Sequence, residues 1–122
     1  MTIARAIAQL RSTDLDASIR FYVERLGMRL AFRYEDFYAG IDADGQMFHL
    51  KQVCEPDPSV ADVCEGGHFH LYFETGDVSA LAARFERNGV RFIEGVRDTD
   101  WGTREFVVED DQGHTLYFGQ PL

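Results

Sequence analysis

The sequence predicts an α+β protein built from two tandem βαβββ modules, which form a curved mixed sheet with a concave cleft and helices on its outer face. Two observations support this fold class. Helical patterns begin at Asp14 and Asp77, 63 residues apart. Turns that end in Gly45 and Gly113, 68 residues apart, each lead into a short apolar segment. One unit of ~50–60 residues therefore occurs twice, as in a duplicated module.

Each predicted helix carries apolar residues at the spacing of an amphipathic helix. Asp14 and Asp77 are suited to cap the helix N-termini through a side-chain oxygen. Gly27 and Gly89 stand where a left-handed residue ends a helix. The apolar stripes are Leu15, Ile19, Tyr22, Val23 and Leu26 in the first helix, and Val78, Leu81, Ala82 and Phe85 in the second.

One strand is expected before each helix and three after it. Asp44-Gly45 is a hairpin signal between the last two strands of the first module. The Pro- and Gly-containing segment 54–67 is interpreted as a linker between module 1 (about 1–53) and module 2 (about 68–122) of a single domain, 1–122. The expected strands are 4–11, 28–34, 37–43 and 46–53 in the first module, and 68–75, 90–94, 103–110 and 114–119 in the second.

The chain of 122 residues is acidic, with 12 Lys+Arg, 21 Asp+Glu and a formal net charge of −9. Phosphate binding needs a basic footprint, and the only lysine is Lys51, so we expect no nucleic-acid partner. An acidic surface also disfavours anionic membranes and favours cationic ligands, although acidity serves solubility as well. We find no signal segment and no apolar run of membrane length, and therefore expect a cytoplasmic protein with no membrane partner. Cys54 and Cys64 are expected to be reduced thiols.

Two motifs carry a resemblance to a known family. The first is Asp14-Leu15-Asp16-Ala17-Ser18-Ile19-Arg20-Phe21-Tyr22, followed by Leu26-Gly27. The second is Trp101-Gly102-Thr103-Arg104-Glu105-Phe106, followed by Asp110-Asp111-Gln112-Gly113. Together they resemble the vicinal oxygen chelate superfamily (glyoxalase, bleomycin resistance protein, dioxygenase), and the second is nearest to the bleomycin-resistance branch. The resemblance covers nearly the whole chain and implies a small-molecule cleft and a homodimer, which would also cover an otherwise free apolar sheet face.

Metal-dependent members of this family take four ligands from the first and last strands of the two modules. By the resemblance, these positions are Ile7, His49, His70 and Tyr117. Ile7 has no donor atom, and a tyrosine with a pKa of ~10 is a poor ligand near neutral pH. We therefore expect no cofactor and no catalytic residue. His49 and His70 would hold any weakly bound divalent metal, and a different strand register would add His68.

Several side chains are candidates to line a ligand cleft. Trp101, the only tryptophan, lies in a polar, acidic loop, where an indole either stacks on a planar or cationic ligand or anchors a loop or dimer. The 68-residue offset matches Tyr38 with Phe106, so both are expected on one face, although strand aromatics are more often core residues. Arg104 and Glu105 point to opposite faces, and which one faces the cleft stays open. The ligand-binding candidates are Trp101, Tyr38, His49, His70, Phe106, Tyr117 and Arg104.

These features favour a metal-independent binding protein for a drug- or antibiotic-like small molecule that is planar or cationic. The alternative is a metal-dependent lyase or dioxygenase of the same superfamily, using His49 and His70. A third hypothesis is a small regulatory or structural domain without a ligand.

Overall fold

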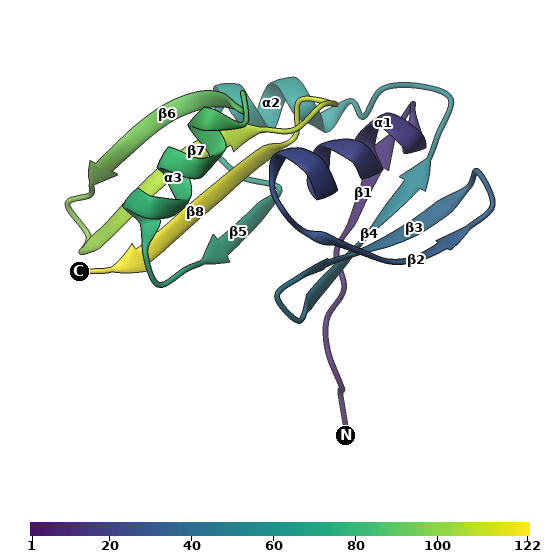
Figure 1. Cartoon of the computed structure of the whole chain (residues 1–122), viewed down its shortest axis with the longest axis horizontal. Coiled ribbons are helices and arrows are strands. Elements are labelled where there is room, and N and C mark those ends of the chain that lie inside the picture. The colour runs from purple at the N-terminus through teal and green to yellow at the C-terminus, as the bar shows by residue number, and fades with distance from the viewer. The chain divides into compact units, whose positions relative to one another are not determined.

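The computed structural model describes all 122 residues and divides into two compact units, Met1–Asp57 and Pro58–Leu122 (Figure 1). Each unit contains one four-stranded mixed sheet with a helix packed against it. The α+β class and the tandem βαβββ order predicted from the sequence are confirmed. No helix has both the length and the apolar composition needed to cross a membrane.

The first unit follows the predicted element order. Its elements are β1 (Gln9–Ser12), α1 (Leu15–Arg20), the π-helical continuation η1 (Phe21–Arg25), β2 (Arg29–Tyr34), β3 (Tyr38–Ala43) and β4 (Gln46–Gln52). Strand β1 pairs in parallel with β4, and the other pairs are antiparallel, which gives the order β1-β4-β3-β2. The first strand is shorter than expected, because residues 1–8 lie outside regular structure.

The second unit repeats this arrangement with one additional helix. Its elements are α2 (Ser59–Glu65), β5 (Leu71–Glu74), α3 (Val78–Arg87), β6 (Arg91–Asp98), β7 (Thr103–Glu109) and β8 (Thr115–Pro121). The sheet order β5-β8-β7-β6 corresponds to that of the first unit. Helix α2 lies in the segment interpreted as a linker. Its N-cap residue, Pro58, makes no side-chain capping bond, so the sequence carried little helix signal there.

The start of the main helix is stabilised in the same way in both units. In the second unit, Asp77 Oδ1 accepts a hydrogen bond from Ala80 N at 3.0 Å, as the capping pattern predicts. Gln120 Oε1, from the last strand, accepts from Val78 N at 2.7 Å and so satisfies another free helix N–H. The corresponding bonds in the first unit are Ala17 N to Asp14 Oδ1 at 3.1 Å and Leu15 N to Gln52 Oε1 at 2.9 Å.

The turn before the last strand differs between the units by one residue. In the first unit, Ala43 pairs with Gln46 across the two-residue turn Asp44-Gly45, whose positive φ angles of 50° and 92° are typical of a type I′ turn. In the second unit, Asp110 N donates to His114 O across three residues. The offset between equivalent residues is therefore 68 after the turn but 67 before it.

This difference changes the residue that matches Tyr38. Tyr38 pairs with Lys51, and Glu105 pairs with Gly119, which is the equivalent of Lys51 at the 68-residue offset. Glu105, and not Phe106, is therefore the counterpart of Tyr38. The match expected from the sequence is wrong by one residue, and a slip of one residue turns a strand side chain to the opposite face.

The core of the second unit lies between α3 and the sheet (Figure 1). Phe85 of α3 meets Phe106 and Phe118 edge to face, with ring centroids 5.8 and 5.1 Å apart. Phe106 stacks on Phe118 at 5.1 Å and is 0% exposed. Because strand side chains alternate between faces, Glu105 and Tyr117 point to the face of the sheet that α3 does not cover.

Candidate functional site

A pocket of about 450 Å³ opens on the uncovered face of the second sheet. Two adjacent strands, β5 and β8, supply Tyr72 and Tyr117, which are register partners. Four aromatic side chains and one carboxylate dominate the lining, which consists of Gly67, His68, Phe69, Tyr72, Trp101, Glu105 and Tyr117. Aromatic walls with a single charged group are typical of a small-molecule site that fixes both the position and the orientation of its ligand.

Three of the rings form a continuous wall. The centroid of Phe69 lies 5.3 Å from that of Tyr117 and 5.5 Å from that of Tyr72, and the two tyrosines are 6.2 Å apart. The Tyr117 hydroxyl donates to the carbonyl oxygen of Gly67 at 3.0 Å, which holds the ring in place. The wall is therefore pre-formed rather than assembled from freely rotating side chains.

Trp101 completes the pocket from the loop between β6 and β7. Its side chain is 66% exposed, so core packing does not explain its position. The guanidinium carbon of Arg97 lies 5.7 Å from the centre of the Trp101 ring, within the range of a cation–π contact. The indole thus already contacts one cation in the folded protein.

Glu105 is the charged group of the pocket and is only 4% exposed. Its Oε2 accepts hydrogen bonds from the Tyr72 hydroxyl at 2.8 Å and from Thr103 Oγ1 at 3.1 Å. Its Oε1 is buried and has no hydrogen-bond partner in the protein. Gly119, the β8 partner of Glu105, makes room for this arrangement, because a Cβ at Gly119 would overlap the Tyr72 hydroxyl.

Arg104, the neighbour of Glu105, does not line the pocket. Its Nε donates to Asp98 Oδ1 at 2.7 Å on the exposed side of the strand pair. That hydrogen bond, together with the guanidinium charge, lowers the pKa of the Asp98 carboxyl. The alternation of strand faces left the choice between Arg104 and Glu105 open, and the register places Glu105 in the pocket.

The Glu105 carboxylate also affects the ionisation of both tyrosines. Burial of the hydroxyl, together with the hydrogen bond to Glu105, raises the pKa of Tyr72 to about 12. Burial first, and then the negative charge of Glu105, raise the pKa of Tyr117 above its ordinary value of 10.0. Both phenols are therefore protonated near neutral pH and act as hydrogen-bond donors, Tyr72 to Glu105 and Tyr117 to the carbonyl oxygen of Gly67.

Absorbance titration of tyrosinate is expected to reveal one group with a pKa of about 12 that is absent from the Tyr72→Phe variant. The folded-state pKa lies above the ordinary 10.0, so the fold favours the neutral phenol. That contribution to stability is present below pH 10 and is lost as the pH rises through 12. Glu105→Gln should lower the pKa of this tyrosine, and a Tyr72 that titrates near 10 in the unmodified chain would contradict the geometry.

The equivalent face of the first unit is occupied by its own polar network. Gln9 Nε2 donates to the Tyr38 hydroxyl at 3.0 Å, and Tyr38 Oη lies 3.0 Å from His49 Nδ1. Burial, and then the positive charge of Arg5, lower the pKa of His49. A neutral His49 whose Nδ1 accepts a hydrogen bond from the Tyr38 hydroxyl agrees with both the short distance and the lowered pKa. Phe32 stacks on Tyr38 with centroids 6.4 Å apart.

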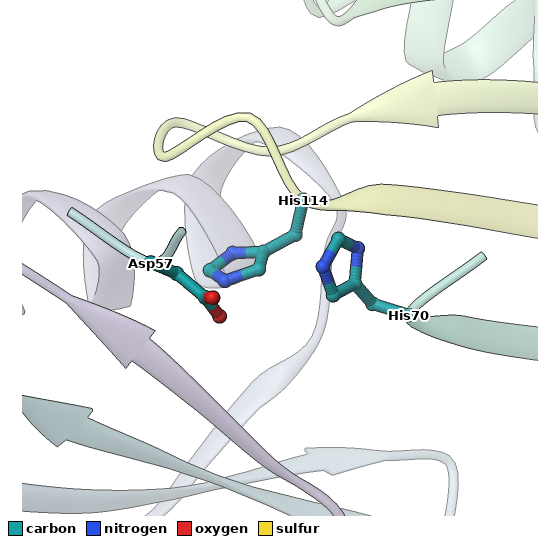
Figure 2. Close-up of side chains that lie close together, drawn as sticks. All are labelled: Asp57, His70 and His114. Atoms are coloured by element: carbon teal, nitrogen blue, oxygen red, sulfur yellow. The ribbon is translucent and has the colours of Figure 1, made fainter. Parts of the chain in front are cut away.

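His70 lies outside the aromatic pocket, beside His114 (Figure 2). The two imidazoles meet edge to face with centroids 4.8 Å apart. His70 Nδ1 accepts from Thr115 N at 3.0 Å, so the ring proton of neutral His70 is on Nε2 and donates to Ser59 Oγ at 3.0 Å. Both ring nitrogens are thus used to join β5, β8 and α2 within the second unit.

The donor groups at the four metal positions implied by the family do not fit a divalent ion. Ile7 offers no ligand atom, and the Tyr117 hydroxyl is protonated near neutral pH and donates a hydrogen bond to the carbonyl oxygen of Gly67. His70 uses both ring nitrogens in hydrogen bonds, and His49 Nδ1 is bonded to the Tyr38 hydroxyl. Neither Ile7 nor His70 thus offers a donor atom for a divalent ion, which usually needs at least three protein ligands.

The sequence-derived candidates are divided among different environments. Trp101 and Tyr117 line the pocket, whereas Tyr38 and His49 lie on the sheet face of the first unit. His70, Arg104 and Phe106 lie elsewhere in the second unit: His70 in a hydrogen-bonded cluster, Arg104 in an ion pair with Asp98, and Phe106 in the core. The sequence analysis missed Phe69 and Tyr72, and it named Arg104 as a candidate while leaving open whether Arg104 or Glu105 faces the cleft. The available signal for Tyr72 was the alternation of side chains along a strand. Tyr72 is two residues after the candidate His70 and is therefore expected on the same side of the strand.

Comparison with known proteins agrees with this architecture. The chain is similar to TioX from Micromonospora sp. ML1, with 25% identity, coverage of 98% of this chain and 97% of that one, and a TM-score of 0.74. It is also similar to the bleomycin-binding protein from bleomycin-producing Streptomyces verticillus, solved with copper(II)-bleomycin, with 24% identity, coverage of 97% and 96%, and a TM-score of 0.76. A glyoxalase/bleomycin resistance protein/dioxygenase from Alicyclobacillus acidocaldarius has 21% identity, coverage of 100% and 96%, and a TM-score of 0.78.

Among curated proteins, no sequence matches the chain significantly. The family description Glyoxalase/Bleomycin resistance protein/Dioxygenase superfamily matches residues 3–118, which is nearly the whole chain. The match includes both βαβββ units and confirms the resemblance carried by the helix motif and the Trp101–Gly113 motif. The chain therefore belongs to the Glyoxalase/Bleomycin resistance protein/Dioxygenase superfamily.

Proposed function

We propose that the chain binds a small organic molecule that has a positive charge and a flat apolar part, without a metal ion and without chemical conversion. The observation that carries this proposal is the buried carboxylate of Glu105 inside an aromatic pocket. Aromatic faces attract cations, and a carboxylate in a place of low dielectric attracts them more strongly still. The formal net charge of −9 adds a long-range attraction for the same class of ligand.

The size of the pocket agrees with a drug- or antibiotic-like ligand. A volume of about 450 Å³ lies within the usual range of sites for such molecules. One protein of the same fold was solved with copper(II)-bleomycin, so this fold can hold a large drug-like molecule. The metal-dependent lyase or dioxygenase alternative has less support, because His49 and His70 are both engaged within their own units.

The homodimer is part of the same proposal. Strand β2 forms one edge of the first sheet, and all six of its residues are exposed. Three of them are the large apolar side chains Leu30, Phe32 and Tyr34, a composition that favours a covered surface. Sedimentation velocity should give twice the chain mass of 13.9 kDa, and a monomer at micromolar concentration would contradict this part of the proposal.

Trp101 fluorescence provides a direct test, because Trp101 is the only tryptophan. Matched sets of flat compounds with a cationic, a neutral or an anionic substituent should be titrated into the protein. We expect saturable quenching by the cations, weaker quenching by the neutral compounds and none by the anions. Equal responses to all three charge types would contradict a cation site.

Replacing Trp101 should separate its stacking role from a structural one. We expect Trp101→Ala to weaken cation binding about 10-fold, as loss of a cation–π and stacking contact predicts, and Trp101→Phe to retain most of the affinity. Calorimetry should be used because the fluorophore is lost. Removal of divalent metals with a chelator should leave the affinity unchanged. A loss of binding that added Zn²⁺ or Mn²⁺ restores would favour the metal-dependent alternative.

A further inference from the structure

One oxygen of the Glu105 carboxylate is satisfied and the other is not. Tyr72 and Thr103 both donate to Oε2, whereas the buried Oε1 accepts from no group of the protein. Most buried polar atoms in folded proteins are hydrogen-bonded, so a buried acceptor without a partner, in a residue that lines a pocket, needs an explanation. A buried carboxylate that also lacks an ion-pair partner is a costly feature for a fold to retain.

The surrounding residues fix the orientation of this carboxylate. Thr103 Oγ1 lies 2.8 Å from Thr99 Oγ1, and Thr99 Oγ1 in turn accepts from Thr103 N at 3.1 Å. The hydroxyl that donates to Glu105 is therefore itself held by the turn between β6 and β7. With Tyr72 on the same oxygen, rotation of the carboxylate would break two hydrogen bonds. Oε1 thus stays in place as an acceptor without a partner, in a residue that lines the pocket.

We propose that Oε1 of Glu105 accepts a hydrogen bond from the cationic nitrogen of the ligand, so that the pocket selects protonated amines over quaternary ammonium ions. This inference rests on the proposed binding of an organic cation in the same pocket. Both kinds of cation gain from the aromatic rings, because cation–π attraction needs only the charge. Only a nitrogen that carries hydrogen also satisfies Oε1, and a quaternary ammonium ion would bury this acceptor without a partner.

Glu105→Gln reverses the polarity at this point without changing the size of the side chain. Tyr72 and Thr103 both donate, so the amide oxygen of glutamine takes the place of Oε2. The amide NH₂ group then stands where Oε1 was and offers donors instead of an acceptor. A ligand N–H is repelled by this group, whereas a quaternary ammonium ion loses only the charge attraction.

The test compares benzyl- and naphthylmethylammonium with their N,N,N-trimethyl analogues by calorimetry, in the unmodified chain and in Glu105→Gln. Glu86→Gln is the matched control, because it removes the same charge from an exposed position on α3, which packs on the opposite face of the sheet. We expect each amine to bind about 10-fold more tightly than its trimethyl analogue. In Glu105→Gln, amine binding should weaken about 10- to 100-fold and the preference should disappear, as the loss of a charged hydrogen bond predicts. Glu86→Gln should retain both the affinity for the amines and the preference for amines over the trimethyl analogues.

The other outcomes overturn the inference in distinguishable ways. If the trimethyl analogues bind as tightly as the amines, the selection of N–H donors is wrong while cation binding stands. If the preference for amines persists in Glu105→Gln, the selection is steric and Glu105 is not its cause. If neither the amines nor the trimethyl analogues, at millimolar concentration, shift the NMR signal of the Trp101 indole N–H, the inference and the proposed function both fail. Thermal unfolding of Glu105→Gln checks that the variant is folded at the temperature of the titration.

Discussion

Asp110→Ala is expected to lower the free energy of unfolding by about 3 kcal/mol, because it removes the acceptor of three hydrogen bonds at a buried strand end. Asp110 Oδ1 accepts from His114 N at 2.8 Å and from Gln112 N at 2.9 Å. Asp110 Oδ2 lies 2.8 Å from His114 Nδ1, and the side chains of both residues are only 1% exposed. Alanine would remove this acceptor from the buried His114 donors, and the loss of a hydrogen bond at a buried group costs about 1–3 kcal/mol.

Two variants of the same turn make this prediction specific. Asp111→Ala, the exposed neighbour, should change the free energy of unfolding by less than about 0.5 kcal/mol, as is usual for surface positions. Asp110→Asn keeps an oxygen for the two backbone donors and should cost about 1 kcal/mol. Urea unfolding followed by circular dichroism measures all three. Equal losses for Asp110→Ala and Asp111→Ala would mean that the buried hydrogen bonds do not stabilise this strand end.

The same turn explains what the sequence could predict of the fold and where it failed. Helix caps are local signals, and Asp14 and Asp77 cap their helices as predicted. The hairpin at Asp44-Gly45 was also predictable, since its two positive φ angles need such residues. The length of the second turn was not. The turn length depends on which residues pair across the strands. The glycines that end the two turns are 68 residues apart, whereas equivalent residues of the preceding strands are 67 apart, so the glycines alone do not reveal the difference.

Two residues of the pocket, Trp101 and Tyr117, could be named from the sequence, each from a separate signal. Trp101 stood out because an indole in an acidic loop has no core to enter. Tyr117 could be placed because β8 follows the turn, where the 68-residue offset holds. Glu105 was left open because strand alternation gives two faces without saying which face is buried. Buried Glu105 is held by hydrogen bonds from Tyr72, which is distant in the sequence, and from Thr103, which is on the same strand. No sequence pattern identifies either residue as a partner of Glu105.

Phe106→Ala is expected to lower the free energy of unfolding by about 3–5 kcal/mol, the usual cost of truncating a fully buried aromatic side chain. The ring of Phe106 is 0% exposed and packs against Phe85, Phe118 and Phe92, with centroids 5.8, 5.1 and 5.4 Å away. Alanine would leave a cavity between α3 and the sheet that these rings can fill only in part. Phe37→Ala, at an exposed ring, should cost less than about 1 kcal/mol and serves as the control for loss of an aromatic side chain.

This variant also tests the register on which the candidate site depends. Phe106 and Glu105 are neighbours on β7 that face opposite sides of the sheet, so their substitutions should have opposite consequences. Phe106→Ala should lower stability strongly and, at a temperature where it is still folded, bind organic cations with nearly unchanged affinity. Glu105→Gln should weaken the binding of protonated amines with a smaller loss of stability. If Phe106→Ala instead abolished binding and left stability unchanged, Phe106 would line the pocket as the counterpart of Tyr38, and the 67-residue offset of β7 would be wrong.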